Sequence, residues 1–116
     1  MAEPNIADDV LEAAAREVAV PVALVRSKAR YPRLVLARLA SMWILRAQGW
    51  TLNEIARFIF GHADHTSVMH SLAAKKREND PEFLRLVTRV VIRVQAVQRD
   101  RARLERVRRA ASVARG

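Results

Sequence analysis

Four consecutive polar residues have side chains that could do chemistry together: Asp64, His65, Thr66 and Ser67. An Asp carboxylate can accept a hydrogen bond from a cytosine amino group, and His, Ser and Thr can donate to N7 or O6 of a purine. The methyl group of Thr can also contact a thymine methyl group. Because these side chains are short, a helix that begins with them can approach base edges closely. The four residues are therefore a candidate base-reading site.

Catalysis and metal binding are weaker interpretations of the same segment. Ser67, His65 and Asp64 are too close together on one helix end to form a nucleophile, a base and an orienting acid. His62 and Asp64 could join a metal site, but His65 and His70 are five residues apart and share no helix face, and the chain has no cysteine. We therefore expect no enzymatic activity, no cofactor and no metal. Two simpler roles stay open, with Asp64 as only a helix N-cap and His65 as a plain surface residue.

Apolar residues recur at helical spacing almost throughout the chain, which predicts an all-α fold. The expected helices cover residues 6–18, 22–27, 32–47, 52–60, 64–77 and a last helix from 81 to well past 99. A helix at 52–60, a short turn with Gly61 and a helix at 64–77 have the sequence form of a helix-turn-helix. In that motif the first residues of the second helix meet base edges in the DNA major groove, and Asp64–Ser67 would lie there.

Capping residues indicate where the predicted helices begin and end. Thr51 and Glu54 match a capping box. Gly49 and Gly61 are expected to stop the helices that precede them. Asn5 is the expected N-cap of the first helix, whose acidic residues would then lie near the positive end of the helix dipole.

The helix at 32–47 is apolar nearly all round, which is typical of a central core helix. Trp43 and Trp50 are expected in the core or at its rim. The three arginines of this helix could be only a solvated face: Arg33, Arg38 and Arg46.

The chain is strongly basic, with 21 Lys and Arg against 12 Asp and Glu and a net charge of +9. Residues 26–46 carry six basic residues and no acidic one, and residues 82–116 carry ten basic and three acidic ones. Residues 1–25 are acidic, and residues 47–81, with the candidate reading site, are neutral. A folded basic domain favours a polyanionic partner, with nucleic acid first and a membrane surface second. No apolar run reaches the roughly 18 residues of a membrane span, so we expect no membrane partner.

The last predicted helix is long and basic. Its apolar residues Phe83, Val90, Val97, Leu104 and Ala111 are spaced by sevens, with Val87 and Val94 between them, until Arg101 and Arg108 interrupt the seam. We therefore divide the chain into a domain over residues 1–97 and an Arg-rich extension over residues 98–116. The extension could contact DNA phosphates, with Arg101 as one such contact, bind a protein partner, or have no role.

Several motifs resemble one known family. The run from Gly61 to His70, GHADHTSVMH, resembles the GGRDHTTVLH signature of the C-terminal DNA-binding domain of the bacterial replication initiator DnaA. The runs at 22–28, 31–33 and 51–55 are similar to further landmarks of that domain, in the same order and at similar spacing. The resemblance covers about residues 8–78, and it implies a helix-turn-helix bundle of the Trp-repressor and DnaA C-terminal type. Nothing resembles the initiator's ATPase domain, so we expect a stand-alone module.

The resemblance also implies which residues contact DNA. The implied set is Lys28, Arg30, Arg33, His62, Asp64, His65, Thr66, Ser67 and Lys75. Within it, Asp64–Ser67 would read bases in the major groove, and Arg33 would contact a phosphate or a neighbouring base edge. Lys28 and Arg30 would reach the adjacent minor groove. The basic loop here is shorter than the family's, and Ala63 replaces the family's Arg before the Asp-His pair, which predicts a changed target sequence.

The leading functional prediction is a sequence-specific double-stranded DNA-binding protein that acts as a transcriptional regulator in the bacterial cytoplasm, at the nucleoid. Modules similar to this family's domain occur in activators of phage-derived and gene-transfer-agent clusters, so an activator is expected, with the transcription machinery or another regulator as a possible partner. One alternative is a replication accessory at DnaA-box-like sites. Another is a protein–protein adaptor that docks through the last helix. Monomer and homodimer both stay open.

Overall fold

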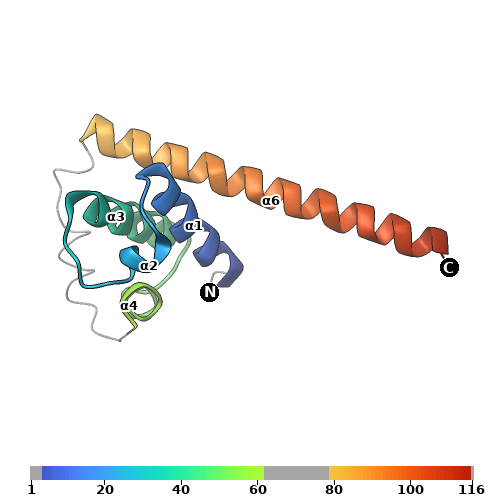
Figure 1. The fold of residues 1–116 in the computed structure, drawn as a ribbon, viewed down its shortest axis with the longest axis horizontal. Coiled ribbons are helices and arrows are strands. Elements are labelled where there is room, and N and C mark those ends of the chain that lie inside the picture. The colour runs from blue at the N-terminus through green and yellow to red at the C-terminus, as the bar shows by residue number, and fades with distance from the viewer. Residues whose placement is uncertain (1–3, 62–78, 116) are drawn as a thin grey trace.

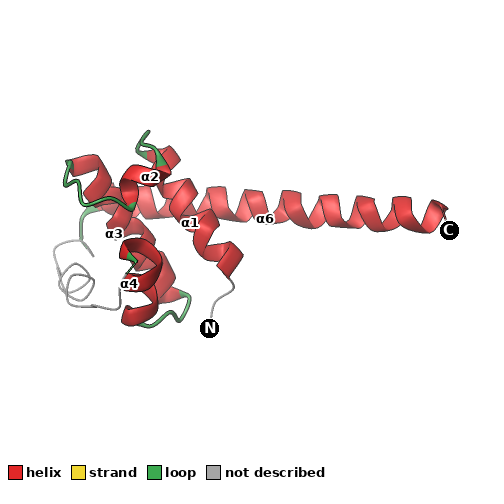
Figure 2. Ribbon diagram, turned by 60° about the horizontal axis from the view of Figure 1, so that its bottom comes forward, coloured by secondary structure: helices red, strands yellow, loops and turns green. Residues whose placement is uncertain are grey.

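The computed structural model describes residues 4–61 and 79–115, and its regular structure is helical throughout these ranges (Figure 1, Figure 2). The helices are α1 (Pro4–Glu17), α2 (Val22–Val25), α3 (Pro32–Ala47), α4 (Leu52–Phe60) and α6 (Pro81–Arg115). No strand occurs in the described ranges. The predicted all-α fold with a long C-terminal helix is therefore confirmed, and four predicted helices lie within two residues of their observed bounds.

Helix α3 is the centre of the fold, and it contacts α1, α2, α4 and α6. Most of its residues are buried, including Leu34, Leu39 and Leu45. This confirms the prediction of a core helix from its nearly continuous apolar surface. Trp43 packs edge-on against Phe83 of α6, with ring centroids 5.6 Å apart. This aromatic pair joins the central helix to the long C-terminal one.

Helix α1 begins at Pro4, so Asn5 lies inside the helix and its prediction as the N-cap is wrong. Proline suits the first turn of a helix because its fixed φ is already helical. The N–H that proline lacks would have no partner within the helix at that position. The first turn contains no acidic residue. Asp9 is instead 8% exposed, and its carboxylate accepts two hydrogen bonds from Arg101.

Left-handed residues end three helices. Gly49 and Gly61 have φ of 93° and 78° at the ends of α3 and α4, as the sequence predicted. Helix α1 ends at Glu17 and is followed by Ala19, the one described non-glycine residue with positive φ, at 59°. The N–H of Val20 then bonds the carbonyl of Ala15 at 3.0 Å, which closes the helix end as in a Schellman motif.

Helix α4 begins with the predicted capping box. The N–H of Glu54 donates to the Thr51 hydroxyl at 3.1 Å, and the N–H of Thr51 donates to the Glu54 carboxylate at 2.9 Å. These hydrogen bonds to Thr51 lower the pKa of Glu54. Ile55 and Ile59 bury the inner face of the helix against the core. The first helix of the predicted helix-turn-helix is therefore fixed at both ends and along one face.

Helix α6 is far longer than the body it packs against (Figure 1). Its 35 residues span about 52 Å at 1.5 Å per residue, and the longest extent of the molecule is 55 Å. Its buried residues are Phe83, Leu86, Val90 and Val94, while Val97 is 42% exposed and Leu104 is 56% exposed. The predicted seam therefore packs only along the first half of the helix. The second half extends into solvent.

Candidate nucleic-acid interface

The loop from α2 to α3, residues 26–31, and the first turn of α3 present three cations to solvent. Lys28, Arg30 and Arg33 are all exposed. None of their side chains forms a hydrogen bond or an ion pair with another residue in the described ranges. The structure thus brings together the three described members of the predicted DNA-contact set.

The buried side chain of Arg38 fixes the position of this loop through hydrogen bonds to backbone carbonyls. Its guanidinium donates to the carbonyl oxygens of Val25 at 2.6 Å, Ser27 at 2.6 Å and Leu24 at 3.2 Å. Burial of Arg38, and then the nearby charge of Arg30, lower the pKa of the Arg38 side chain. The interpretation of Arg38 as part of a solvated face is therefore wrong, because its charge is used inside the protein to hold backbone carbonyls.

Two further residues fix the beginning of the loop. The Ser27 hydroxyl donates to the carbonyl of Leu24 at 2.7 Å and accepts from the N–H of Ala29 at 3.2 Å. The Arg26 guanidinium lies 4.7 Å from the centre of the Phe58 ring, and it approaches Asp8 at 3.5 Å. Arg26 is thus tied to α1 and α4. The loop residues beyond it carry the cations that face solvent.

The start of α3 adds a positive helix end to these side chains. Tyr31 is the N-cap and makes no side-chain capping bond, and Pro32 is the first helical residue. Backbone N–H groups in a first helical turn have no partner within the helix, and the helix dipole makes this end positive. An anionic group such as a phosphate is favoured there. Arg33 sits in this turn, so its charge adds to that of the helix end.

Arg46 also forms a hydrogen bond within the protein. Its guanidinium donates to the carbonyl of Trp50 at 2.8 Å and thereby holds the turn between α3 and α4. Trp50 is buried and packs edge-on against Phe58, with centroids 5.6 Å apart. Of the three arginines of α3, Arg33 is the one whose side chain has no partner in the described ranges. A cation inside a helix that is apolar nearly all round was the available signal for Arg38.

The other predicted site residues lie outside the described residues. They are His62, Asp64, His65, Thr66, Ser67 and Lys75, together with the predicted second helix at 64–77. The first described range ends at Gly61, whose left-handed backbone stops α4 directly before this segment. The structure therefore establishes the helix that precedes the candidate reading site and the point where that helix ends.

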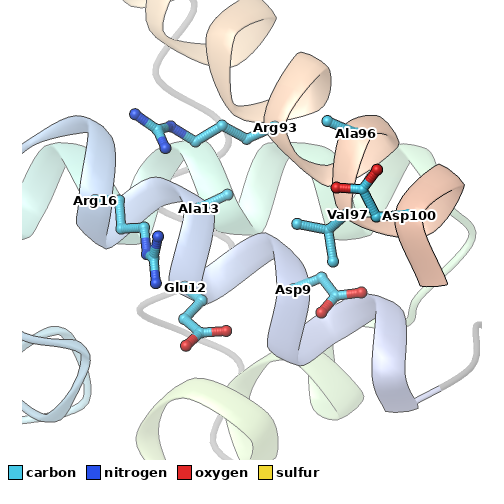
Figure 3. Close-up of a pocket in the computed structure, with 8 residues that line it drawn as sticks. All are labelled: Asp9, Glu12, Ala13, Arg16, Arg93, Ala96, Val97 and Asp100. Atoms are coloured by element: carbon cyan, nitrogen blue, oxygen red, sulfur yellow. The ribbon is translucent and has the colours of Figure 1, made fainter. Parts of the chain in front are cut away.

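Other kinds of site find little support in the described ranges. No group of His, Asp and Glu there could hold a metal ion. A search of the same residues found no helix with the length and apolar character that a membrane crossing requires. The groove between α1 and α6 (Figure 3) has a lining of mixed charge, with acidic residues Asp9, Glu12 and Asp100 and basic residues Arg16 and Arg93. Such a lining does not favour an anionic ligand.

Comparison with known proteins agrees with these observations. A family model described as the bacterial DnaA protein helix-turn-helix matches residues 7–74, more than half of the chain. The match runs from α1 through α4 into the predicted reading segment. No curated protein and no solved structure matches the chain. The chain therefore belongs to the bacterial DnaA helix-turn-helix family and is a DNA-binding domain whose partner is double-stranded DNA.

Proposed function

We propose that this protein binds double-stranded DNA in a sequence-specific way through two groups of residues. Asp64, His65, Thr66 and Ser67 read base edges in the major groove, with His62 and Lys75 beside them. Arg33 contacts a phosphate or a neighbouring base edge, and Lys28 and Arg30 reach the adjacent minor groove. The observation that carries the proposal is the loop of three solvent-facing cations that Arg38 holds in place at the start of α3.

The distribution of charge supports a division of labour between these groups. Residues 26–46 carry six basic residues and no acidic one, while residues 47–81 carry four of each. Phosphate contacts position a protein on the duplex, and contacts with base edges supply the specificity. The loop therefore provides affinity that does not depend on sequence. The neutral segment with Asp64–Ser67 provides the discrimination between sites.

We further propose that the protein regulates transcription, as an activator of a phage-derived or gene-transfer-agent-like gene cluster. The support is the resemblance of the module to DNA-binding modules in such activators. The matched part of the chain carries the DNA-binding module, and a module of this kind acts by positioning other proteins on DNA. An activator would therefore recruit the transcription machinery or another regulator to the bound site.

Genome-wide mapping of bound sites, followed by footprinting, tests this role. Sites at promoters, with reduced expression of the adjacent genes when the protein is removed, are the expected result. Clusters of bound sites at a replication origin would instead favour a replication accessory at DnaA-box-like sequences. If replacing both His65 and Thr66 by alanine left the biological output intact, the protein would act as an adaptor and the proposal would be wrong.

A further inference from the structure

The second half of α6 is a cationic arm that lies beyond the residues matched by the DNA-binding family model. We define the arm as residues 98–115. It contains seven arginines, two acidic residues and no lysine. From Arg99 to Arg115 every residue is exposed, and the last buried residue of the helix is Val94. The arm is thus a single helix with solvent on nearly all sides.

Two ion pairs join α6 to α1, one at the base of the arm and one just before it. Arg101 donates two hydrogen bonds of 3.0 Å to the Asp9 carboxylate, and Arg93 donates one of 2.6 Å to Glu17. The Asp9 carboxylate raises the pKa of Arg101. The prediction that Arg101 contacts phosphate is therefore replaced by a structural role. These pairs set the direction in which the remaining arginines project.

The other arginines of the arm have little or no compensation. Arg103 lies 3.8 Å from Asp100 and Arg109 lies 4.0 Å from Glu105, and such exposed pairs contribute little. The remaining four form no ion pair with a residue in the described ranges: Arg99, Arg106, Arg108 and Arg115.

The bare arm is stabilised only weakly as a helix. Most of the stability of a protein helix comes from packing of its apolar face, and the apolar side chains of the arm are all exposed. Like charges three or four residues apart also repel each other, as Arg99 and Arg103 or Arg103 and Arg106 do here. An anionic partner that approaches these side chains would remove this repulsion and stabilise the helix.

The arrangement of the side chains favours a nucleic-acid backbone over a protein helix. With 3.6 residues per turn, Arg108 lies on the opposite side of the helix from Arg99, and Val113 lies opposite Leu104. The arm therefore has cations on several sides, and its short apolar strip of Leu104, Val107 and Ala111 lies between Arg103 and Arg108. A second copy of the arm would bring the same excess of positive charge. Arginine, in contrast, binds phosphate with two parallel hydrogen bonds.

The arm and the cationic loop lie at opposite ends of the long axis of the molecule. Figure 1 and Figure 2 both show the loop before α3 at one end and the C-terminus of α6 at the other. The arm itself is about 27 Å long at 1.5 Å per residue. The phosphates within reach of its arginines are therefore different from those that Lys28, Arg30 and Arg33 would contact.

We propose that the arm is a second binding site for the phosphate backbone of duplex DNA, outside the site that the loop and the reading segment occupy. This inference rests on the proposed function, since it assumes that the module is bound to its own DNA site. The phosphates come either from the flank of the same duplex or from a second duplex segment. Either source has the same chemistry, and the experiment distinguishes them.

The test compares two double variants of the full chain. Arg99→Gln with Arg106→Gln removes two charges from the arm. Arg85→Gln with Arg89→Gln removes two exposed charges from the packed half of the same helix and is the matched control. Glutamine has nearly the helix propensity of arginine, so circular dichroism should show equal helix content.

Binding is measured on the selected site flanked on each side by about one helical turn, roughly 10 bp. In one version the flanks have natural phosphates, and in the other they have neutral methylphosphonates. The wild type and the control should prefer natural flanks, and the arm variant should lose that preference. Between 50 and 200 mM salt, loss of two phosphate contacts should make the affinity of the arm variant fall about tenfold less than that of the wild type.

A second assay asks whether the wild type on a bead-bound site captures a labelled second duplex, with sedimentation in parallel to show whether the protein is a monomer. If the wild type prefers charged flanks, the arm binds the same duplex. If the monomeric wild type captures the second duplex and the arm variant does not, the arm binds a second duplex. The proposal would be overturned if the wild type showed neither a preference for charged flanks nor capture of a second duplex. It would also be overturned if the arm variant and the control behaved alike, or if only a dimer captured the second duplex. Failure of all three proteins to distinguish the selected site from scrambled DNA on neutral flanks would count against the proposed function instead.

Discussion

The guanidinium of Arg38 donates to the carbonyl oxygen of Val25 at 2.6 Å, across 13 residues of sequence. With its bond to the carbonyl of Ser27, also 2.6 Å, this contact ties the central helix to the loop that carries Lys28 and Arg30. A buried charge thus positions exposed charges of the same sign. The position of the exposed cationic loop therefore depends on a buried residue of the core.

Arg38→Met should destabilise the fold and weaken DNA binding, although Arg38 itself is buried away from any ligand. Removal of the donor takes away the side-chain bonds to the buried carbonyl of Val25 and the partly buried carbonyl of Ser27, which costs about 2–3 kcal/mol in the free energy of unfolding. Urea denaturation measures this cost, and duplex binding is then measured under conditions where the variant is folded. The control is Arg46→Met, which also removes a bond to a backbone carbonyl but lies at the far end of α3. If the folded Arg38 variant bound DNA as tightly as this control, the positioning role would be wrong.

Replacing the solvent-facing cations should change the salt dependence of binding. If five or six phosphates are neutralised, log K should fall with log salt with a slope of roughly −4.5 to −5.5. Arg33→Gln should reduce the magnitude of that slope by about 0.9 and weaken binding to all sequences alike. The comparison variant is Arg16→Gln, which removes an exposed charge from α1. An unchanged slope for the Arg33 variant would remove it from the interface.

Ala19→Gly should stabilise the protein. Ala19 ends α1 with φ of 59°, a left-handed conformation that costs about 1–2 kcal/mol for a residue with a Cβ atom. Glycine avoids this cost but adds entropy to the unfolded chain, so a net gain of up to about 1 kcal/mol is expected. Thermal unfolding measures the change. Gly49→Ala, which creates the same strain at φ of 93°, should lower the melting temperature.

The capping box of α4 should make stability depend on pH in the acid range. Since the hydrogen bonds from Thr51 lower the pKa of Glu54 in the folded protein, its contribution is complete above the ordinary carboxyl pKa. The contribution is lost as the pH falls through the lowered value. Urea unfolding of the wild type and of Glu54→Gln at a series of pH values should show a difference that shrinks on acidification. Thr51→Ala should cost about 1 kcal/mol at neutral pH, and equal stability of this variant and the wild type would contradict the role of the cap.

The helices were predictable because their ends depend on local chemistry. Thr51 with Glu54, and the glycines at 49 and 61, act within a few residues of themselves, and the structure confirms all of them. The last helix begins at Pro81, and the carboxylate of Asp80 accepts from the N–H of Glu82 at 3.0 Å, which is again a local contact. Asn5 is of a residue type that favours the N-cap, but Pro4, one residue earlier, already lies in the helix.

The roles of the arginines were not predictable in the same way. Arg101 meets Asp9 across 92 residues of sequence, and Arg38 meets carbonyls of a different element. Both depend on which segments the tertiary fold brings together. Composition identifies an excess of positive charge but cannot separate the arginines that hold the fold from those left for a ligand. The structure makes that separation for the described part of the chain.

The central claim is that the module recognises a particular DNA sequence, and one binding measurement tests it most directly. A duplex is selected from random sequences with the wild-type protein, and its affinity is compared with that of a scrambled duplex at physiological salt. The account predicts that the selected duplex binds about 10³-fold or more tightly, and that His65→Ala costs roughly 1–3 kcal/mol, mostly at one base pair. Equal affinity for the selected and scrambled duplexes would contradict it.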